Sequence, residues 1–420
     1  MTTAASILPG PSTLAGSRPL DLSCDLLLPR LRPEASLTVL DITKFFGPTT
    51  GGIRTYLLEK SRYVQSREGL RHTVIVPGPI DDQSDENGVR WYHVRGRPIP
   101  TQHPYRFLLR SSTINRLISH ESPDIIEVGS PWLIPWITQP IARRLHIPLV
   151  WFYHTNLPRI ISPRPGSDRW GRRMAGKCAE AYIHRLRRVF HGAIAASNAA
   201  VRSLEQAGFE RIEKVPLGVD LQHFHPDRRA SKAETRARYN LPEGPLALYV
   251  GRLAREKELD LVIDAWPQVE SRMGASLVLV GDGPSKEYFR GRCDARRVYW
   301  LPHEADRDRL ADLIAAADLV IAPGPAETFG LAALEAMASG VPVLSSDQGA
   351  VRELIEASGS GEVNPYPQAD AMAASVVHLF QQDLPRLGAL GRRYAETSHS
   401  WSAVFDRLFN AYRRLLEDFQ

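Results

Sequence analysis

Short apolar runs alternate along this chain with segments whose apolar residues recur every three or four positions. In the first half, each apolar run is bounded by glycine, proline or small polar residues, which is typical of a buried strand. The runs are LTVLDI from Leu37, HTVIVPG from His72, DIIEVGS from Asp124, PLVWFYH from Pro148 and GAIAASN from Gly192. Because the segments between them have helical periodicity, residues 37–217 are predicted to form a doubly wound α/β domain with a parallel sheet.

The same alternation starts again after residue 243. The expected strands are PLALYVGRL from Pro245, SLVLVGDGP from Ser276, RVYWLP from Arg297, DLVIAPG from Asp318 and PVLSSD from Pro342. Helical patterns separate most of these runs. Residues 244–398 are therefore predicted to form a second Rossmann-like domain.

Three further segments have patterns of their own. Residues 1–36 lack periodicity and are expected to form a loose arm with one docked segment. Residues 218–243 are polar and interrupted by proline, as in a linker. Residues 399–420 predict an amphipathic helix with Ser400 as its N-cap. Its apolar residues, spaced by three and four, are Trp401, Phe405, Leu408, Tyr412, Leu415 and Phe419.

Composition narrows the cellular setting and the partners. No apolar run reaches the roughly 18 residues of a spanning helix, and the N-terminus lacks the pattern of a signal peptide. The 3 cysteines are scattered, so we expect no disulfide framework and a cytoplasmic protein. A net charge of +5 and a pI near 9.1 favour anionic partners, namely nucleotides, acidic lipid surfaces or nucleic acid.

Glycines follow the first expected strand of the first domain. Gly51 and Gly52 lie between that strand and a helix, where backbone N–H groups can approach a phosphate closely. An ordinary glycine turn accounts for the same residues.

Cations follow the first expected strand of the second domain. Arg252 and Lys257 come directly after LALYVG, which ends at Gly251, and together they would neutralise a pyrophosphate. Two solvated charges at the start of a helix are the simpler interpretation.

Two glutamates bracket the stretch ETFGLAALE. Gly330 allows a tight entry into the helix that carries Glu335, so that the N–H groups near Gly330 and Leu331 point at an anion. Glu327 and Glu335 would accept hydrogen bonds from sugar hydroxyls, although glutamates near a helix start are often simply helix-favouring charges. The small apolar residues of LAALEAMASG predict a buried helix, in which Glu335 needs a partner.

These motifs, GRLAREKELD, VLVGDGP and PGPAETFGLAALEAMASGVPVLSSDQGAVREL, resemble the C-terminal domain of the retaining glycosyltransferases of the large family 4 type, which includes bacterial mannosyl- and glucosyltransferases. PLGVDLQHF and GGIRTYLLE resemble the same family. The resemblance spans residues 37 to 420 and implies the GT-B fold, with two facing Rossmann-like domains and a final helix that crosses back to the first. The arm before Leu37 departs from the family pattern.

The resemblance also implies a role for each motif residue. Arg252 and Lys257 hold the donor diphosphate, Glu335 binds the ribose and Glu327 contacts the transferred sugar. His154, at the end of PLVWFYH, lies near the sugar and the leaving group, whereas without the resemblance a buried core histidine is the simpler interpretation. The implied catalytic residues are His154, Glu327, Arg252 and Lys257. The implied donor-binding residues are Gly51, Gly52, Gly251, Arg252, Lys257, Thr328, Phe329, Gly330, Leu331 and Glu335.

The resemblance implies a reaction that keeps the anomeric configuration of the sugar. A glycosidase-like route needs two carboxylates about 5–5.5 Å apart, and the first domain's motifs offer no nucleophile. We therefore expect a same-face displacement in which the leaving diphosphate helps to deprotonate the incoming hydroxyl. No D-x-D motif lies in a suitable loop, so we expect neither a metal nor a cofactor, with the nucleotide-sugar as a substrate.

Several alternatives remain for the donor and the reaction. The sequence lacks the G-x-G-x-x-G of a nicotinamide-dependent dehydrogenase and any nucleic-acid-binding motif, but a sugar-nucleotide epimerase of the same fold stays open. GDP-mannose is the favoured donor, with a UDP-glucose-dependent glucosyltransferase as the alternative. The stretch YHTNLPR resembles that of transferases that glycosylate lipids, which implies a lipid acceptor rather than a glycan.

A basic segment before residue 189 suggests contact with a membrane. Residues 159–188 are rich in arginine and carry Trp170, Met174, Cys178 and Tyr182 at intervals of four. Such a helix is expected to bind anionic lipid at the inner face of the membrane. An ordinary helix that packs its apolar stripe on the first domain accounts for the pattern equally well.

Overall fold

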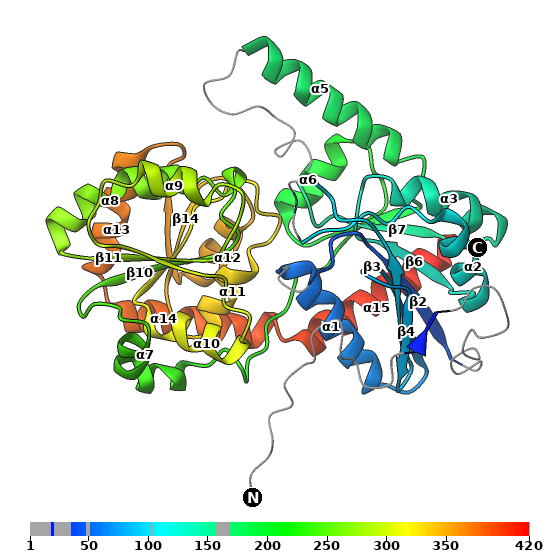
Figure 1. The fold of residues 1–420 in the computed structure, drawn as a ribbon, viewed down its shortest axis with the longest axis horizontal. Coiled ribbons are helices and arrows are strands. Elements are labelled where there is room, and N and C mark those ends of the chain that lie inside the picture. Colours follow the sequence, from blue (N-terminus) through cyan, green and yellow to red (C-terminus); the bar gives the residue numbers. More distant parts are fainter. Residues whose placement is uncertain are drawn as a thin grey trace, which may run out of the picture.

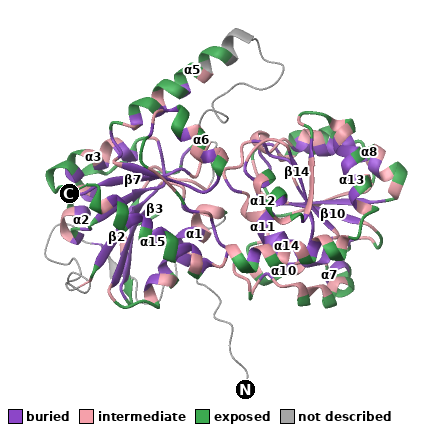
Figure 2. Ribbon diagram, turned by 180° about the vertical axis from the view of Figure 1, so that it is seen from behind, coloured by how far each residue is buried: buried purple, intermediate pink, exposed green. Residues whose placement is uncertain are grey.

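Two sheets, each with helices on both faces, form the two halves of the chain (Figure 1). The computed structural model describes residues 18–20, 35–47, 51–100, 102, 104–156 and 169–419. Within these ranges, no helix is long and apolar enough to cross a membrane. Most strands are buried and form the core together with the inner faces of the helices, whereas strands at the sheet edges are only partly buried (Figure 2). The predicted pair of doubly wound α/β units is confirmed.

The sheet of the first domain has 9 strands in the order β1-β4-β5-β3-β2-β6-β7-β8-β9. All neighbours are parallel except β1 with β4 and β4 with β5. The strands are β1 Arg18–Pro19, β2 Leu37–Ile42, β3 Leu70–Gly78, β4 Asp82–Glu86, β5 Val89–Arg95, β6 Ile125–Val128, β7 Leu149–Phe152, β8 Gly192–Ala195 and β9 Ile212–Lys214. The helices are α1 Gly52–Gln65, α2 Ser111–Glu121, α3 Ile134–Arg144, α5 Arg169–Leu186 and α6 Asn198–Gln206.

The second sheet has 6 parallel strands in the order β12-β11-β10-β13-β14-β15. They are β10 Leu246–Val250, β11 Ser276–Val280, β12 Val298–Leu301, β13 Leu319–Ala322, β14 Val343–Ser346 and β15 Gly361–Asn364. The helices around it are α8 Leu259–Met273, α9 Lys286–Arg292, α10 Arg307–Ala316, α11 Leu331–Ala338, α12 Val351–Ser358, α13 Ala369–Phe380 and α14 Leu384–Ser398.

Part of the polar stretch between the domains is fixed to the second one. It forms a 3-10 helix, Pro226–Ser231, and helix α7, Lys232–Arg238, which pack against α10. Arg228 forms ion pairs with Asp308 and Asp312 of α10, and Arg236 pairs with Asp318. Several of the charges that make this stretch look like a solvated linker in the sequence are therefore paired with the second domain.

The chain passes between the domains twice, and the two crossings lie side by side. Val219 pairs with Ser400 as a parallel bridge, and the Val219 N–H donates to the carbonyl of His399 at 2.8 Å. The ring of His399 also donates to the carbonyl of Leu217 at 2.9 Å. A Cβ atom on Gly218 would lie only 2.7 Å from the ring of Trp401, so glycine is required there.

Helix α15, Trp401–Glu417, leaves the second domain and packs on the first (Figure 1). The Ser400 hydroxyl accepts a hydrogen bond from the Ala403 N–H, which confirms the predicted N-cap. Its apolar face lies against α1. There the hydroxyl of Tyr412 accepts a hydrogen bond from the buried Lys60 at 2.6 Å and donates to Glu127.

Helix α5 extends away from the body of the first domain (Figure 1). Its C-terminal half packs on the domain through the buried side chains of Ala179, Ile183 and Leu186. Met174 and Cys178 are exposed, whereas Tyr182 donates a hydrogen bond to the carbonyl of Pro131 at 2.7 Å. Met174 and Cys178 of the predicted apolar face are therefore not covered by the first domain, whereas Tyr182 is held against it. The side chain of Trp170 lies outside the described residues.

Candidate active site

The candidate site lies where the carboxyl ends of the first domain's strands approach the second domain. His154 follows β7, and the hydroxyl of Thr328 donates to the His154 carbonyl at 2.9 Å. The hydroxyl of Ser197, after β8, donates to the carbonyl of Thr328, also at 2.9 Å. Ligands of open α/β sheets bind outside the carboxyl ends of the strands. The segment that precedes α11 is therefore held at the ligand-binding edge of the first sheet.

Two helices begin beside each other at this edge. Helix α1 starts at Gly52 and α11 at Leu331, and a Cβ atom on Gly52 would lie 3.8 Å from the Leu331 side chain. Gly330 has a φ of +95°, and a side chain there would overlap Val351, so the entry into α11 requires glycine. Nothing among the described residues lies within 4 Å of a Cβ atom on Gly51. Two adjacent helix N-termini with open backbone at one of them create a positive potential suited to an anion.

The two predicted cations lie near these helix starts, but neither is free. Lys257 forms an ion pair with Glu327 at 2.5 Å, and Arg252 pairs with Glu256. The predicted cation pair and the first predicted glutamate therefore come together. Their partial exposure leaves them accessible to a ligand.

Gly251 and Phe329 shape the backbone around these residues. A Cβ atom on Gly281, after β11, would overlap the Gly251 carbonyl, so the chain just beyond the neighbouring parallel strands β10 and β11 runs in close contact. The side chain of Phe329 is buried and its ring lies 5.7 Å from the ring of His399. Phe329 therefore anchors the segment before α11 in the core, and only its backbone is available to a ligand.

Tyr105 of the first domain also faces the cation pair. Burial raises the pKa of its hydroxyl, and the charges of Arg252, Glu256 and Lys257 act on it across the domain boundary. Its ring lies edge-on to that of Phe45 at 5.5 Å. Tyr105 is not predicted from the sequence, because it stands in a segment without periodicity.

Glu335 is buried, and the charge that acts on it is that of Arg307. Burial raises the pKa of its carboxyl to about 7, and the positive charge of Arg307 opposes the shift. Arg307 begins α10 and lies 3.9 Å from Glu59 of α1. Burial lowers the pKa of Arg54, as does Arg307, and within the described chain its Nε atom has no hydrogen-bond partner. The sequence predicts that Glu335 needs a partner, but not that Arg307 acts on it or that Arg54 and Glu59 of the first domain lie around Arg307.

His154 is held by aromatic rings. It stacks on Phe152 with ring centroids 4.1 Å apart, and the ring of Tyr56 lies edge-on at 5.3 Å. Burial lowers its pKa to about 4; the negative charge of Glu127 opposes this and Lys60 adds to it. The imidazole is therefore neutral at neutral pH and available for hydrogen bonding rather than as a cation.

A buried polar network supports the ring of Tyr56. Its hydroxyl donates to Glu127 at 3.0 Å, and Lys60 lies 2.8 Å from Asp41 and 3.4 Å from Glu127. Burial raises the pKa of Glu127 to about 7. Because Tyr412 of α15 joins the same network, the last helix contributes to the support of His154. The pattern of apolar residues gave no sign of this network.

Comparisons with known proteins agree with the fold. Residues 50–223 match the family model described as Glycosyltransferase Family 4, and residues 244–382 match Glycosyl transferases group 1. A GDP-mannose-dependent alpha-(1-6)-phosphatidylinositol dimannoside mannosyltransferase of Mycobacterium tuberculosis is 29% identical over 343 residues, covering 81% of this chain and 87% of the relative. A GDP-mannose-dependent alpha-mannosyltransferase of the same species is 27% identical over 376 residues, covering 88% and 95%.

Solved structures share the fold at lower identity. Sucrose-phosphate synthase from Thermosynechococcus elongatus has a TM-score of 0.74 at 20% identity, covering 91% of this chain and 100% of that one. Anabaena HepE in complex with UDP and glucose has a TM-score of 0.69 at 17% identity, covering 90% and 99%. With both halves matched by the family and the fold shared along the chain, this protein belongs to the GT-B glycosyltransferases of the family 4 type.

Proposed function

We propose that this glycosyltransferase moves mannose from GDP-mannose to a hydroxyl of a lipid-linked acceptor and keeps the anomeric configuration. The observation that carries the proposal is the meeting of the α1 and α11 N-termini beside Lys257 and Arg252, which suits a sugar diphosphate. The names of the two mycobacterial relatives support GDP-mannose as the donor. One of those names also supports a phosphatidylinositol-based acceptor.

The donor is held by exchange of partners at the cations. Diphosphate oxygens replace Glu327 at Lys257 and Glu256 at Arg252, because a phosphate carries more charge than a carboxylate. Glu327 is then free to accept hydrogen bonds from hydroxyls of the transferred sugar. The N–H groups at Gly52 and at the start of α11 meet the distal phosphate, and Glu335 accepts from the ribose hydroxyls.

Transfer then depends on charge that grows on the diphosphate. The bond between the anomeric carbon and the phosphate oxygen breaks, while the acceptor oxygen bonds to the same face of that carbon. The acceptor proton passes to the leaving diphosphate. Lys257, Arg252 and the two helix N-termini stabilise the growing charge, and the neutral ring of His154 hydrogen-bonds beside the sugar. We propose that these groups suffice without a metal or a cofactor.

The first test is binding of nucleotides to the protein. A ligand at about 100 times its dissociation constant adds roughly 2.7 kcal/mol of stability, so GDP should raise the melting temperature more than UDP or ADP. A larger shift with UDP would favour the UDP-glucose alternative. No shift with any of the three nucleotides would contradict a nucleotide-sugar site.

The second test follows the product. GDP-mannose should be incubated with a phosphatidylinositol-based acceptor in the presence of a chelator. The product should be an α-linked mannoside, identified from the one-bond coupling between C1 and H1 in NMR spectra. A β-linked product would contradict retention, and activity lost in the chelator but restored by Mg²⁺ would contradict a metal-free site. A changed sugar nucleotide without acceptor would instead identify an epimerase.

A further inference from the structure

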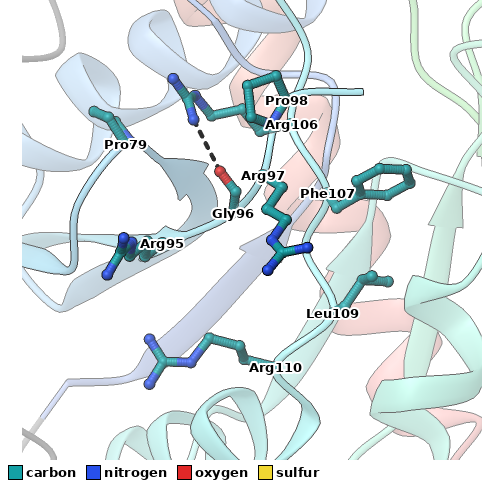
Figure 3. A pocket seen from close by; sticks show the side chains of 9 residues that line it. All are labelled: Pro79, Arg95, Gly96, Arg97, Pro98, Arg106, Phe107, Leu109 and Arg110. Carbon is teal, nitrogen blue, oxygen red and sulfur yellow. Dashed lines mark hydrogen bonds between the residues drawn. The ribbon is translucent and has the colours of Figure 1, made fainter. Parts of the chain in front are cut away.

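A pocket lined by arginines lies on the first domain, apart from the residues of the candidate active site. Its volume is about 590 Å³, within the range of ligand sites. Figure 3 shows Arg95, Arg97 and Arg110 around an open space, with Leu109 at one side. The lining is Pro79, Arg95, Gly96, Arg97, Pro98, Arg106, Phe107, Leu109 and Arg110. It includes four arginines and no carboxylate.

The positive charge of this pocket is only partly compensated. Arg110 pairs with Asp81 at 2.5 Å, and Arg106 donates to the Gly96 carbonyl at 2.9 Å. Arg95 and Arg97 are exposed and form no ion pair within the described ranges. Helix α2 begins at Ser111, next to Arg110, and no side chain of the described residues caps it. Binding of an anion is favourable where like positive charges are held together at a helix N-terminus.

The arginines stand on a fixed backbone. The Ile99 N–H donates to the Tyr105 carbonyl and the Phe107 N–H donates to the Arg97 carbonyl, both at 2.9 Å. A side chain on Gly96 would overlap the Phe107 carbonyl, so glycine is required for this close approach. We call residues 96–100 and 104–110 the arginine loop. Because these backbone hydrogen bonds already fix the loop, binding an anion costs little conformational entropy.

The arginine loop also links the pocket to the active site. The pocket lies at the carboxyl ends of β3 and β5, which is the same edge of the sheet that carries His154. Tyr105 of the loop faces Arg252 and Lys257 of the second domain. Leu109 and Ile80, beside the pocket, are exposed at 50% and 60%. A molecule held in the pocket thus lies on the acceptor side of the transfer site, next to an exposed apolar surface.

We propose that the arginine pocket binds the phosphate of a phosphate-bearing acceptor, with Arg95 and Arg97 as its contacts. The proposal rests on the proposed function, because it assigns the pocket to the acceptor of that reaction. Guanidinium groups hold phosphate oxygens through paired donors, which fixes orientation as well as adding affinity. Leu109 and Ile80 offer the surface for the hydrocarbon of a lipid-borne phosphate.

The experiment measures binding of sn-glycerol 3-phosphate by calorimetry with the donor site saturated by GDP. Arg95→Gln with Arg97→Gln should weaken binding about tenfold or more. The matched control is Arg143→Gln with Arg144→Gln, two exposed arginines at the end of α3, at the opposite edge of the sheet. Equal affinity in the wild type and the pocket variant, no binding at all with GDP present, or an equal loss in the control would overturn the proposal.

A second arm distinguishes the source of the phosphate. Vesicles of equal parts phosphatidylglycerol and phosphatidylcholine should sediment the wild type more than the pocket variant, and Ile80→Ser with Leu109→Ser should reduce sedimentation while leaving glycerol phosphate binding intact. Glycerol phosphate binding without this lipid dependence would support the phosphate site and assign it to a soluble acceptor. GDP binding and donor hydrolysis without acceptor should be unchanged in the pocket variant. Their absence from the wild type would instead contradict the proposed function.

Discussion

Single residues at the candidate site are held by partners that a substrate has to replace. Lys257 is paired with Glu327, Arg252 with Glu256, and Thr328 is bonded to His154 across the domain boundary. Each pairing holds a functional group in place. A substrate can replace the partner at low energetic cost, because the ion pairs are partly exposed and worth about 1 kcal/mol or less. The site is therefore preorganised while its charges stay exchangeable.

The proposed binding of the donor diphosphate by Lys257 and Arg252 predicts a kinetic effect for Lys257. Lys257→Ala should lower kcat by about 100-fold with a much smaller change in the KM for the acceptor, because the charge that Lys257 meets grows in the transition state. Lys286→Ala, in α9 of the same domain, is the control and should behave as the wild type. Steady-state kinetics with varied acceptor measure both constants, and a normal kcat in Lys257→Ala would remove the assignment.

The raised pKa of Glu335 predicts a dependence on pH. Between its usual value of 4.5 and the folded value of about 7, the unfolded chain releases a proton that the folded protein keeps. Stability therefore falls as pH rises through this window, and Glu335→Gln should gain on the wild type by about 1–3 kcal/mol between pH 5 and pH 8. Urea unfolding at several pH values measures the difference. Glu356→Gln, exposed on α12, should show no such trend.

The raised pKa of Glu335 also predicts how the affinity for GDP changes with pH. Only the ionised form accepts hydrogen bonds from both ribose hydroxyls, so affinity should rise from pH 6 to pH 8 in the wild type. In Glu335→Gln the affinity should be lower and flat over this range. Calorimetric titration with GDP checks this, and a parallel rise in the variant would show that another group is responsible.

At the scale of elements, the sequence predicts the helices that begin at the site but not the segments that complete it. The starts of α1 and α11 are predictable, since a glycine between a buried strand and a helical pattern indicates a tight turn into the helix. The β4–β5 hairpin was missed although its turn, Asn87-Gly88, has φ of 48° and 90° and carries the usual hairpin residues. Arg54 and Arg307 were missed because a charge at a helix start looks solvated until a second domain covers it.

Helix α5 is the element for which the sequence predicts contact with a membrane surface. Its N-terminal half projects from the domain (Figure 1), and Arg173, Met174 and Lys177 are not covered by other elements. We predict that Arg173→Glu with Lys177→Glu reduces co-sedimentation with anionic vesicles, since each cation near the surface adds about 1 kcal/mol. Arg187→Glu with Arg188→Glu, beyond the end of the same helix, is the control. Equal sedimentation of both variants with the wild type would leave α5 without a lipid role.

At the scale of the whole molecule, contacts between the domains gather at the site and at the paired crossings. The N–H groups at the start of α6 donate to Glu353 of α12 at 2.8 and 2.6 Å, in addition to the bonds of Thr328. The carboxylate of Glu353 also suits the positive end of the α6 dipole. These polar contacts join the two domains around the site.

This arrangement predicts that donor binding shifts the molecule toward closure. The scattering radius of gyration should fall on addition of saturating GDP, because a ligand that contacts both domains favours the closed population. Thr328→Val keeps the shape of the side chain but removes the hydroxyl that binds His154, so its change should be smaller at the same GDP concentration. An unchanged profile of the wild type would mean that the two domains do not move.

Because helix α15 is the last helix of the chain to be synthesised and packs on the first domain, that domain cannot complete its folding until synthesis nears its end. The ribosome makes the strands and helices of the first domain early, yet their polar core is complete only when Tyr412 reaches Lys60 and Glu127. A nascent chain that stops before residue 399 keeps the covered face of α1 open to water and to chaperones. A protein truncated after Ser398 should therefore bind a hydrophobic dye and be cleaved rapidly within residues 37–217, while its second half resists the protease. The first domain is therefore translated first but completes its folding last.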